Sequence, residues 1–126
     1  MSELSDFFTR SKANEGTKLH LSRPDGSASD HWIMVRHSDS DAYRAKEAEV
    51  RREVTAAVAD GANVADACKA KEIELIASLV AGWSFTDVEF NLENVIEMLK
   101  EAPAIYDGVN KLAGSRASFF GKGAAN

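Results

Sequence analysis

The chain has 126 residues, of which 44% are hydrophobic and 28% are charged, and its formal net charge is −5. This composition predicts one folded, soluble domain and excludes a disordered or fibrous chain. The acidic balance argues against nucleic acid as the main partner, because phosphate binding requires clustered positive charge.

The first residues predict a short helix followed by a polar break. In Ser2–Thr9 either of the two serines can cap the helix, and Leu4, Phe7 and Phe8 share one apolar face. The polar stretch Ser11–Thr17 carries no helical pattern, so we expect it to separate this helix from the next element.

A β-hairpin is expected next. Lys18–Ser22 alternates polar and apolar residues, which is the period of a half-buried strand, and His31–Arg36 is rich in strand formers. Between them Pro24–Gly26 predicts a turn, since proline presets φ and glycine accepts a positive φ. An isolated hairpin is only marginally stable in water, so this one must pack against the rest of the chain.

Two long helices are expected in the middle of the chain. Ser38 and Asp41 have the spacing of a capping box and predict a helix that ends at Gly61. Asn63 can cap the second helix, Val64–Ala81. The later half of this second helix is apolar nearly all round, so we expect it to be the most buried element.

The last third predicts a loop and two shorter helices. Gly82–Phe85 breaks the preceding helix and begins the loop. Asn91 caps a third helix whose apolar residues recur at helical spacing. Pro103 suits the first turn of a fourth helix, which Gly114 weakens or ends.

Together these elements predict an α+β fold that is mostly α, with a small N-terminal β-hairpin packed on a bundle of about four helices. We expect a single domain over residues 1–126. Within it, residues 1–37 form the short helix and the hairpin, residues 38–120 form the helical part, and residues 121–126 form a flexible tail.

The sequence offers little metal-binding or nucleophilic chemistry. His20 and His31 could face each other across the hairpin, but no third ligand lies at helical spacing, so we expect solvent-facing histidines and no metal. The single cysteine, Cys68, excludes an intrachain disulfide. It could be a nucleophile, but a small core hydrophobe is favoured.

Other functional signatures are missing. No phosphate loop, nucleotide-binding glycine pattern or nucleophile elbow is present, so we expect neither an enzyme nor a cofactor. The basic residues of 44–52 alternate with glutamates, which indicates a solvated helix face rather than a nucleic-acid contact. No apolar stretch is long enough to cross a membrane, and the first residues lack a signal-peptide pattern.

Aromatic residues in predicted loops and near the end of the chain have two interpretations. They can cover helix ends and close the core, or they can form a hydrophobic surface that grips another chain. Phe90 belongs to this group. The candidate partner-binding residues are Trp83, Phe85, Phe119 and Phe120.

Seven short motifs, spread through nearly the whole chain, suggest a family. In chain order they are Leu4–Phe8, Pro24–Gly26 with Trp32, Asp39–Asp41 at the start of a charged helix, Gly82–Ser84, the helix Asn94–Leu99, Pro103, and Phe119-Phe120. In their order and spacing they resemble the tail assembly chaperones of long-tailed bacteriophages.

The resemblance implies a non-enzymatic protein that coats the long helical tape measure protein, keeps it soluble and helps recruit tail tube subunits. Such a protein acts in the cytoplasm of the bacterial host and is not expected in the mature virion. A helical domain with a groove suits the apolar stripe of a helical client, and many weakly bound copies would act by avidity. The chain can also associate with further copies of itself, and the sequence does not decide whether it does.

Two alternatives come from other classes: a structural phage tail or head–tail connector protein, and a helical protein-interaction domain unrelated to phages. Structural tube proteins tend to be dominated by strands, whereas about two-thirds of this chain is predicted to be helical. This difference counts against a structural tail or connector protein. A gene directly before a very long helical reading frame would favour the chaperone.

The resemblance also implies a longer product, made when the ribosome slips back by one base near the end of the gene. The common slip site encodes Gly-Lys, as at Gly121-Lys122, but it needs a preceding codon that ends in G, and Phe120 codons end only in U or C. A run of U across Ser118–Phe120 and a run of A into G across Gly121–Gly123 stay permitted. The alternative is that this tail is merely a disordered end.

Overall fold

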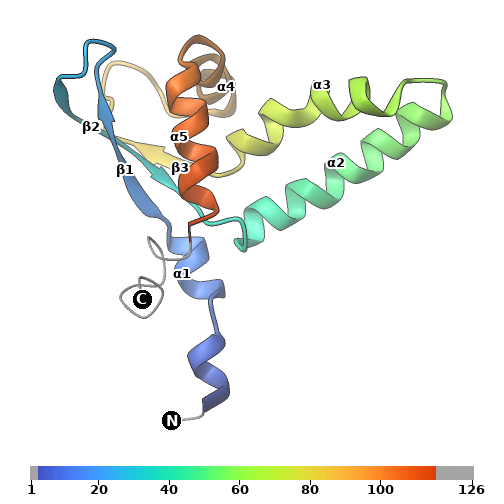
Figure 1. The fold of residues 1–126 in the computed structure, drawn as a ribbon, viewed down its shortest axis with the longest axis horizontal. Helices are drawn as coiled ribbons and strands as arrows, with labels where there is room; N and C mark the ends of the chain where they lie inside the picture. Colours follow the sequence, from blue (N-terminus) through green and yellow to red (C-terminus); the bar gives the residue numbers. More distant parts are fainter. Residues whose placement is uncertain (1–2, 116–126) are drawn as a thin grey trace.

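The computed structural model describes residues 3–115 and packs helices against a small β-sheet (Figure 1). The class predicted from the sequence, α+β and mostly α, is confirmed. Phe119, Phe120 and the tail 121–126 lie outside the described residues. In chain order the elements are the 3-10 helix η1 (Glu3–Phe7), α1 (Arg10–Glu15), β1 (Thr17–Ser22), β2 (Ala28–Val35), α2 (Asp41–Ala59), α3 (Val64–Ala77), β3 (Val80–Trp83), α4 (Leu92–Glu101) and α5 (Pro103–Ala113).

The predicted hairpin forms, and a third strand extends it to an antiparallel sheet of order β1-β2-β3. Gly26 takes a φ of +89° in the turn between β1 and β2, as the predicted turn requires. His20 lies opposite Trp32, so the two histidines do not face each other across the hairpin, and the expectation that they face the solvent is confirmed. Both histidines are exposed.

β3 occupies residues that the sequence assigns to a helix end and a loop. α3 ends at Ala77, before the predicted Ala81, and Val80 and Trp83 pair with β2 instead. Because β2 is the central strand, the backbone groups on its second edge need another strand as partner. A short apolar run such as Val80–Trp83 is compatible with either a helix or a strand. Here the run forms a strand, because it can pair with the open edge of β2.

Arg36 stabilises the transition from α3 to β3. Its backbone N–H donates to the carbonyl oxygen of Leu79 at 2.6 Å, and its Nη1 donates to those of Ser78 and Val80 at 3.0 and 3.3 Å. The carbonyl of Val80 belongs to the first residue of β3, and those of Ser78 and Leu79 follow the last turn of α3, where no further helical N–H is available. A cation also interacts favourably with the helix dipole there.

α1 lies in the polar stretch that we expected to be non-helical, and the residues before it form only η1. Arg10 donates two hydrogen bonds of 2.8 Å to the carboxylate of Asp41, whose backbone N–H donates to Asn14 Oδ1 at 2.7 Å. The hydrogen bond from Arg10 lowers the pKa of Asp41. Ala13 is fully buried. Arg10, Lys12, Ala13 and Glu15 are good helix formers, and these tertiary contacts fix the short helix that they form.

α2 and α3 form a helical hairpin, called the arm below, that extends away from the sheet (Figure 1). The N-cap of α2 is Ser40 rather than the predicted Ser38, because Ser40 Oγ accepts the N–H of Tyr43 at 3.3 Å. Asn63 caps α3 as predicted. No residue of α2 is buried, whereas a helix inside a core would bury a full stripe.

α3 is buried only at its C-terminal end, where Ile76 and Ala77 enter the core. The expectation that this helix is the most buried element is therefore wrong for most of its length. Cys68 is exposed, which corrects its interpretation as a core residue. It lines a shallow apolar depression of the arm together with Val50 and Leu75.

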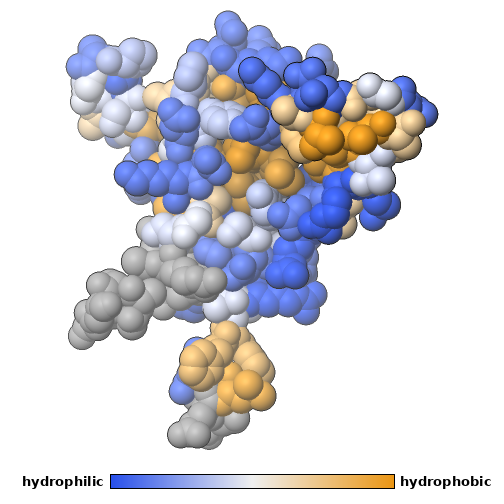
Figure 2. Space-filling view, turned by 45° about the vertical axis from the view of Figure 1, so that its right-hand side comes forward, coloured by the Kyte–Doolittle hydropathy of each residue, from blue (hydrophilic) through white to orange (hydrophobic). Residues whose placement is uncertain are grey.

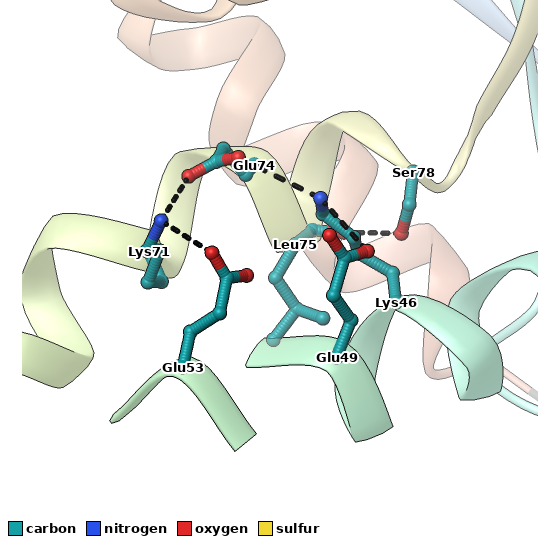
Figure 3. Close-up of polar contacts among 7 residues, drawn as sticks. All are labelled: Lys46, Glu49, Glu53, Lys71, Glu74, Leu75 and Ser78. Carbon is teal, nitrogen blue, oxygen red and sulfur yellow. Dashed lines mark hydrogen bonds and ion pairs between the residues drawn. The ribbon is translucent and has the colours of Figure 1, made fainter. Parts of the chain in front are cut away.

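Charged side chains join the two helices of the arm (Figure 3). Lys71 Nζ lies 3.0 Å from Glu53 Oε2 and 3.4 Å from Glu74 Oε2. Lys46 Nζ lies 3.3 Å from Glu49 Oε2 and 3.6 Å from Glu74 Oε1, so Glu74 bridges both lysines. The hydrogen bonds to Glu53 and then to Glu74 raise the pKa of Lys71.

The hydrophobic core lies where the sheet meets α4, α5 and the end of α3. Asn91 and Pro103 begin α4 and α5 as predicted, and each helix buries an apolar stripe at helical spacing. The buried core residues are Ile33, Val35, Ile76, Ala77, Leu79, Val80, Val95, Leu99, Val109 and Ala113.

Candidate protein-binding groove

Trp83 ends β3 and anchors a cluster of aromatic rings. Its ring meets those of Phe85 and Phe90 edge to face, with centroids 5.5 and 5.1 Å apart, an arrangement that aromatic pairs favour. Phe85 also contacts the ring of His31 at 4.6 Å. The two candidate residues Trp83 and Phe85 are therefore neighbours, and both are half-buried.

Ser84 fixes the path of the loop that follows β3. Its N–H donates to the carbonyl oxygen of Trp32 at 3.0 Å, and its Oγ accepts the Trp32 N–H at 2.8 Å. The same Oγ lies 3.1 Å from His31 Nδ1. Further along the loop, Val88 accepts a hydrogen bond of 3.3 Å from Trp83 Nε1. These bonds tie the aromatic cluster to the edge of the sheet.

Two asparagines join the other end of this loop to α4. Asn91 Oδ1 accepts the N–H of Asn94 at 2.8 Å, which caps the helix. Asn94 Nδ2 in turn donates to the carbonyl oxygen of Glu89 at 2.8 Å. The loop is thus fixed against the helix at one end and against the sheet at the other.

A groove of about 390 Å³ opens between this loop and α4. Most of its surface is apolar, and Val88 and Phe90, which are 43% and 41% exposed, present further apolar surface at this place. We call it the acid-rimmed groove. Its lining residues are Trp83, Phe85, Asp87, Val88, Asn94, Glu97, Met98 and Glu101.

Three carboxylates line the groove, and no basic side chain does. Asp87 comes from the loop, and Glu97 and Glu101 come from α4, one helical turn apart. Within residues 3–115, no ion pair or hydrogen bond engages these three carboxylates. The groove therefore combines an apolar floor with three carboxylates that form no ion pair with any described residue.

The sequence identified the aromatic wall of the groove but not the wall from α4. Glu97, Met98 and Glu101 were not among the candidates. One signal was present: Glu93, Glu97 and Glu101 recur at four-residue spacing and so share one helix face. That this face meets Trp83 depends on the packing of α4 beside β3. The candidates Phe119 and Phe120 lie outside the described residues.

A second apolar surface lies on the N-terminal segment. Leu4, Phe7 and Phe8 are all exposed, Phe7 by 79%, and none belongs to the hydrophobic core. Figure 2 shows hydrophobic side chains gathered on this segment, which projects below the body of the molecule. The apolar face predicted for these residues thus exists but packs on no core element.

The part of the chain that the structure describes holds no group of three His, Cys, Asp or Glu side chains that could bind a metal ion. Nor does any helix in this part have the length and apolar composition needed to cross a membrane.

A mostly helical fold with an apolar groove and exposed aromatic side chains is typical of a protein-binding module. The family model of the phage tail assembly chaperones matches residues 12–111, and the chain belongs to this family. Neither a curated protein nor a solved structure matches the chain. Membership confirms the resemblance seen in the sequence and gives the chain a chaperone role in phage tail assembly, which takes place in the host. Its partners are phage tail proteins.

Proposed function

We propose that this chaperone binds the tape measure protein of its phage, keeps it soluble in the host cytoplasm and helps recruit tail tube subunits. The acid-rimmed groove is the binding site, and the protein leaves before the virion is complete. A tape measure protein is a long helical chain whose apolar stripe needs cover until the tube surrounds it. Many copies along one client would bind by avidity rather than by one tight contact.

The observation that carries this proposal is the half-buried pair Trp83 and Phe85 on the floor of an open groove. Aromatic side chains of this kind are enriched at the energetic centres of protein interfaces. Val88 and Phe90 extend the apolar surface beside them. A groove with an apolar floor is the usual receptor for one face of an amphipathic helix.

Co-expression with the tape measure protein of the same genome tests this function. We expect the soluble fraction of the tape measure protein to rise several-fold with the wild-type chain. Val88→Asp places a charge on the groove and should abolish most of this rise. Because Val88 is 43% exposed, this change leaves the core intact.

Val64→Asp is the matched control, since Val64 is 57% exposed and lies on the arm. It should leave the tape measure protein as soluble as the wild type does. If Val64→Asp abolishes the effect and Val88→Asp does not, the arm and not the groove is the binding site. Phe120→Asp tests the remaining candidate region in the same assay.

Two results would favour the alternative functions. Detection of the chain in purified virions by mass spectrometry would indicate a structural tail or head–tail connector protein. No change in tape measure solubility with the wild-type chain would contradict the chaperoning of this client and leave a helical interaction domain for another partner.

A further inference from the structure

The segment 83–101, which contributes both walls of the acid-rimmed groove, carries most of the net charge of the chain. Residues 83–101 contain five carboxylates and one amine, Lys100, so this segment holds a net charge of −4 out of −5 for the whole protein. Lys100 does not line the groove, whereas three of the carboxylates do. Any partner that enters meets an apolar floor and a negative rim at once.

The carboxylates of Asp87, Glu97 and Glu101 form no ion pair with any residue that the structure describes, and Lys100, which lies near Glu97 and Glu101, does not line the groove. An apolar partner that covered them would remove water from three negative charges without compensation, which is costly. A partner that brings cations to the rim avoids this cost and gains electrostatic attraction. The rim therefore discriminates between partners that bury equal apolar area.

The spacing of the rim favours a helical partner. Glu97 and Glu101 are separated by one turn of α4, about 6 Å along the helix axis. Lys or Arg residues four apart on a partner helix have the same spacing. The loop carboxylate of Asp87 lies on the other wall, where it can meet a cation beyond the apolar stripe.

We propose that the acid-rimmed groove selects an amphipathic helix whose apolar anchor side chains are flanked by Lys or Arg. This inference rests on the proposed function and specifies which segments of the client are bound. Acidic amphipathic helices are rejected by the same rim, so the chaperone covers the basic apolar segments of its client and leaves the acidic ones uncovered.

Two synthetic helices that share one leucine stripe and differ only in flanking lysines or glutamates test the proposal. Their affinities for the full chain can be measured by fluorescence anisotropy of a labelled peptide. Three exposed charge pairs together support about a tenfold preference for the lysine peptide. This preference should shrink at high salt, because exposed charges are screened. A third peptide with the lysine composition but a scrambled stripe should bind no better than the glutamate peptide.

A matched pair of triple variants separates the rim from the net charge of the chain. Asp87→Asn with Glu97→Gln and Glu101→Gln removes the rim, and we expect it to abolish the preference. The control carries Glu15→Gln, Asp60→Asn and Asp66→Asn, which are three exposed sites away from the groove. It has the same net charge and should keep the preference.

Three results would overturn the proposal. Equal loss of the preference in both triple variants would mean that the net charge attracts any cationic peptide. Equal binding of the glutamate and lysine peptides would mean that the rim does not discriminate. Concentration-dependent self-association, measured by sedimentation and lost only in the rim variant, would make a second copy the occupant, since Arg116, Phe119, Phe120 and Lys122 carry the same chemistry.

Failure of this inference is distinguishable from failure of the proposed function. If Val88→Asp abolishes tape measure solubility but the peptides show no charge preference, the function stands and the proposed selectivity is wrong. If the wild-type chain does not solubilise the tape measure protein but the lysine peptide is preferred, the groove has the proposed chemistry and another client.

Discussion

The arm and the part of the molecule around the sheet are stabilised by different interactions. The sheet, α4, α5 and the end of α3 share ten buried apolar residues, whereas α2 contributes none over its 19 residues. In the arm, Lys46 and Lys71 connect the two helices through glutamates that are themselves partly exposed (Figure 3). Apolar burial makes the region around the sheet cooperative. The partly solvated ion pairs of the arm contribute little to global stability.

This difference indicates that the two regions respond differently to mutation, salt and pH. A region with few buried apolar contacts opens locally at a lower free energy than the core does. The acid-rimmed groove belongs to the region around the sheet, because β3 and α4 form its two sides. The groove therefore lies in the region that contains the buried core, whereas α2 of the arm buries no residue.

The largest effect is expected for Leu79→Ala. Leu79 is 1% exposed between α3 and β3, and truncation of a buried leucine costs about 2–5 kcal/mol of unfolding free energy. Leu92→Ala is the matched control, since Leu92 is 57% exposed on α4 and should change stability by less than about 0.5 kcal/mol. Urea denaturation followed by circular dichroism measures both. A neutral Leu79→Ala would show that this residue is not part of a cooperative core.

A smaller loss is expected for Gly16→Ala, at the junction of α1 and β1. Gly16 has φ +87° and ψ 178°, a region that essentially only glycine adopts, and a Cβ there would lie 2.8 Å from the carbonyl oxygen of Val35. We expect a loss of about 1–3 kcal/mol. Gly26→Ala, where φ is +89° but no atom lies within 4 Å, should cost about 1 kcal/mol. Equal thermal midpoints for the two variants would contradict the steric contribution at Gly16.

Lys71→Met should loosen the arm with little effect on global stability. The change removes the cation between Glu53 and Glu74 and leaves the two carboxylates close to each other. We expect faster hydrogen exchange of amides in α2 and α3 and unchanged exchange in β2 and α5. Lys69→Met, an exposed site on the same helix, should change neither. If exchange in the core rises equally with Lys71→Met, the arm and the core unfold as one unit.

The smallest effect concerns pH at the contact between α1 and α2. The hydrogen bond from Arg10 lowers the pKa of Asp41 from its ordinary value of 3.8. A carboxylate with a lowered pKa in the folded state contributes stability above its unfolded pKa, and this contribution disappears as pH falls through the folded value. The protection of the α1 amides, measured as the intrinsic exchange rate divided by the observed rate at each pH, should therefore fall below about pH 4. Asp41→Asn should exchange faster already at neutral pH and lose this part of the acid dependence. Equal acid dependence in both proteins would contradict the assignment to Asp41.

Local sequence signals predicted the elements whose ends have specific chemistry. Asn63 and Asn91 cap α3 and α4, and Pro103 begins α5, because a capping amide or a proline acts within a few residues of its own position. The β-hairpin also followed from alternation and turn residues. The wrong predictions concern α1 and β3, whose conformations depend on partners distant in sequence: Asp41 for α1 and the open edge of β2 for β3.

The candidate site also contains residues that the sequence could nominate and residues that it could not. Trp83 and Phe85 could be nominated from the sequence, because large aromatic residues in a predicted loop either close the core or form a surface that binds another chain. Glu97 and Glu101 could not, because an acidic stripe on a helix is ordinarily only its solvated face.

The sequence by itself thus determined the caps of α3 and α4, the start of α5 and the hairpin, all of which depend on residues close together in the chain, and the order of its motifs indicated the family. Only the tertiary structure decided that β3 joins the sheet, that α2 and most of α3 stay outside the core and that the acidic face of α4 meets Trp83. These features depend on contacts between distant segments, and the free energy of such contacts comes from surfaces that meet only after the chain has folded.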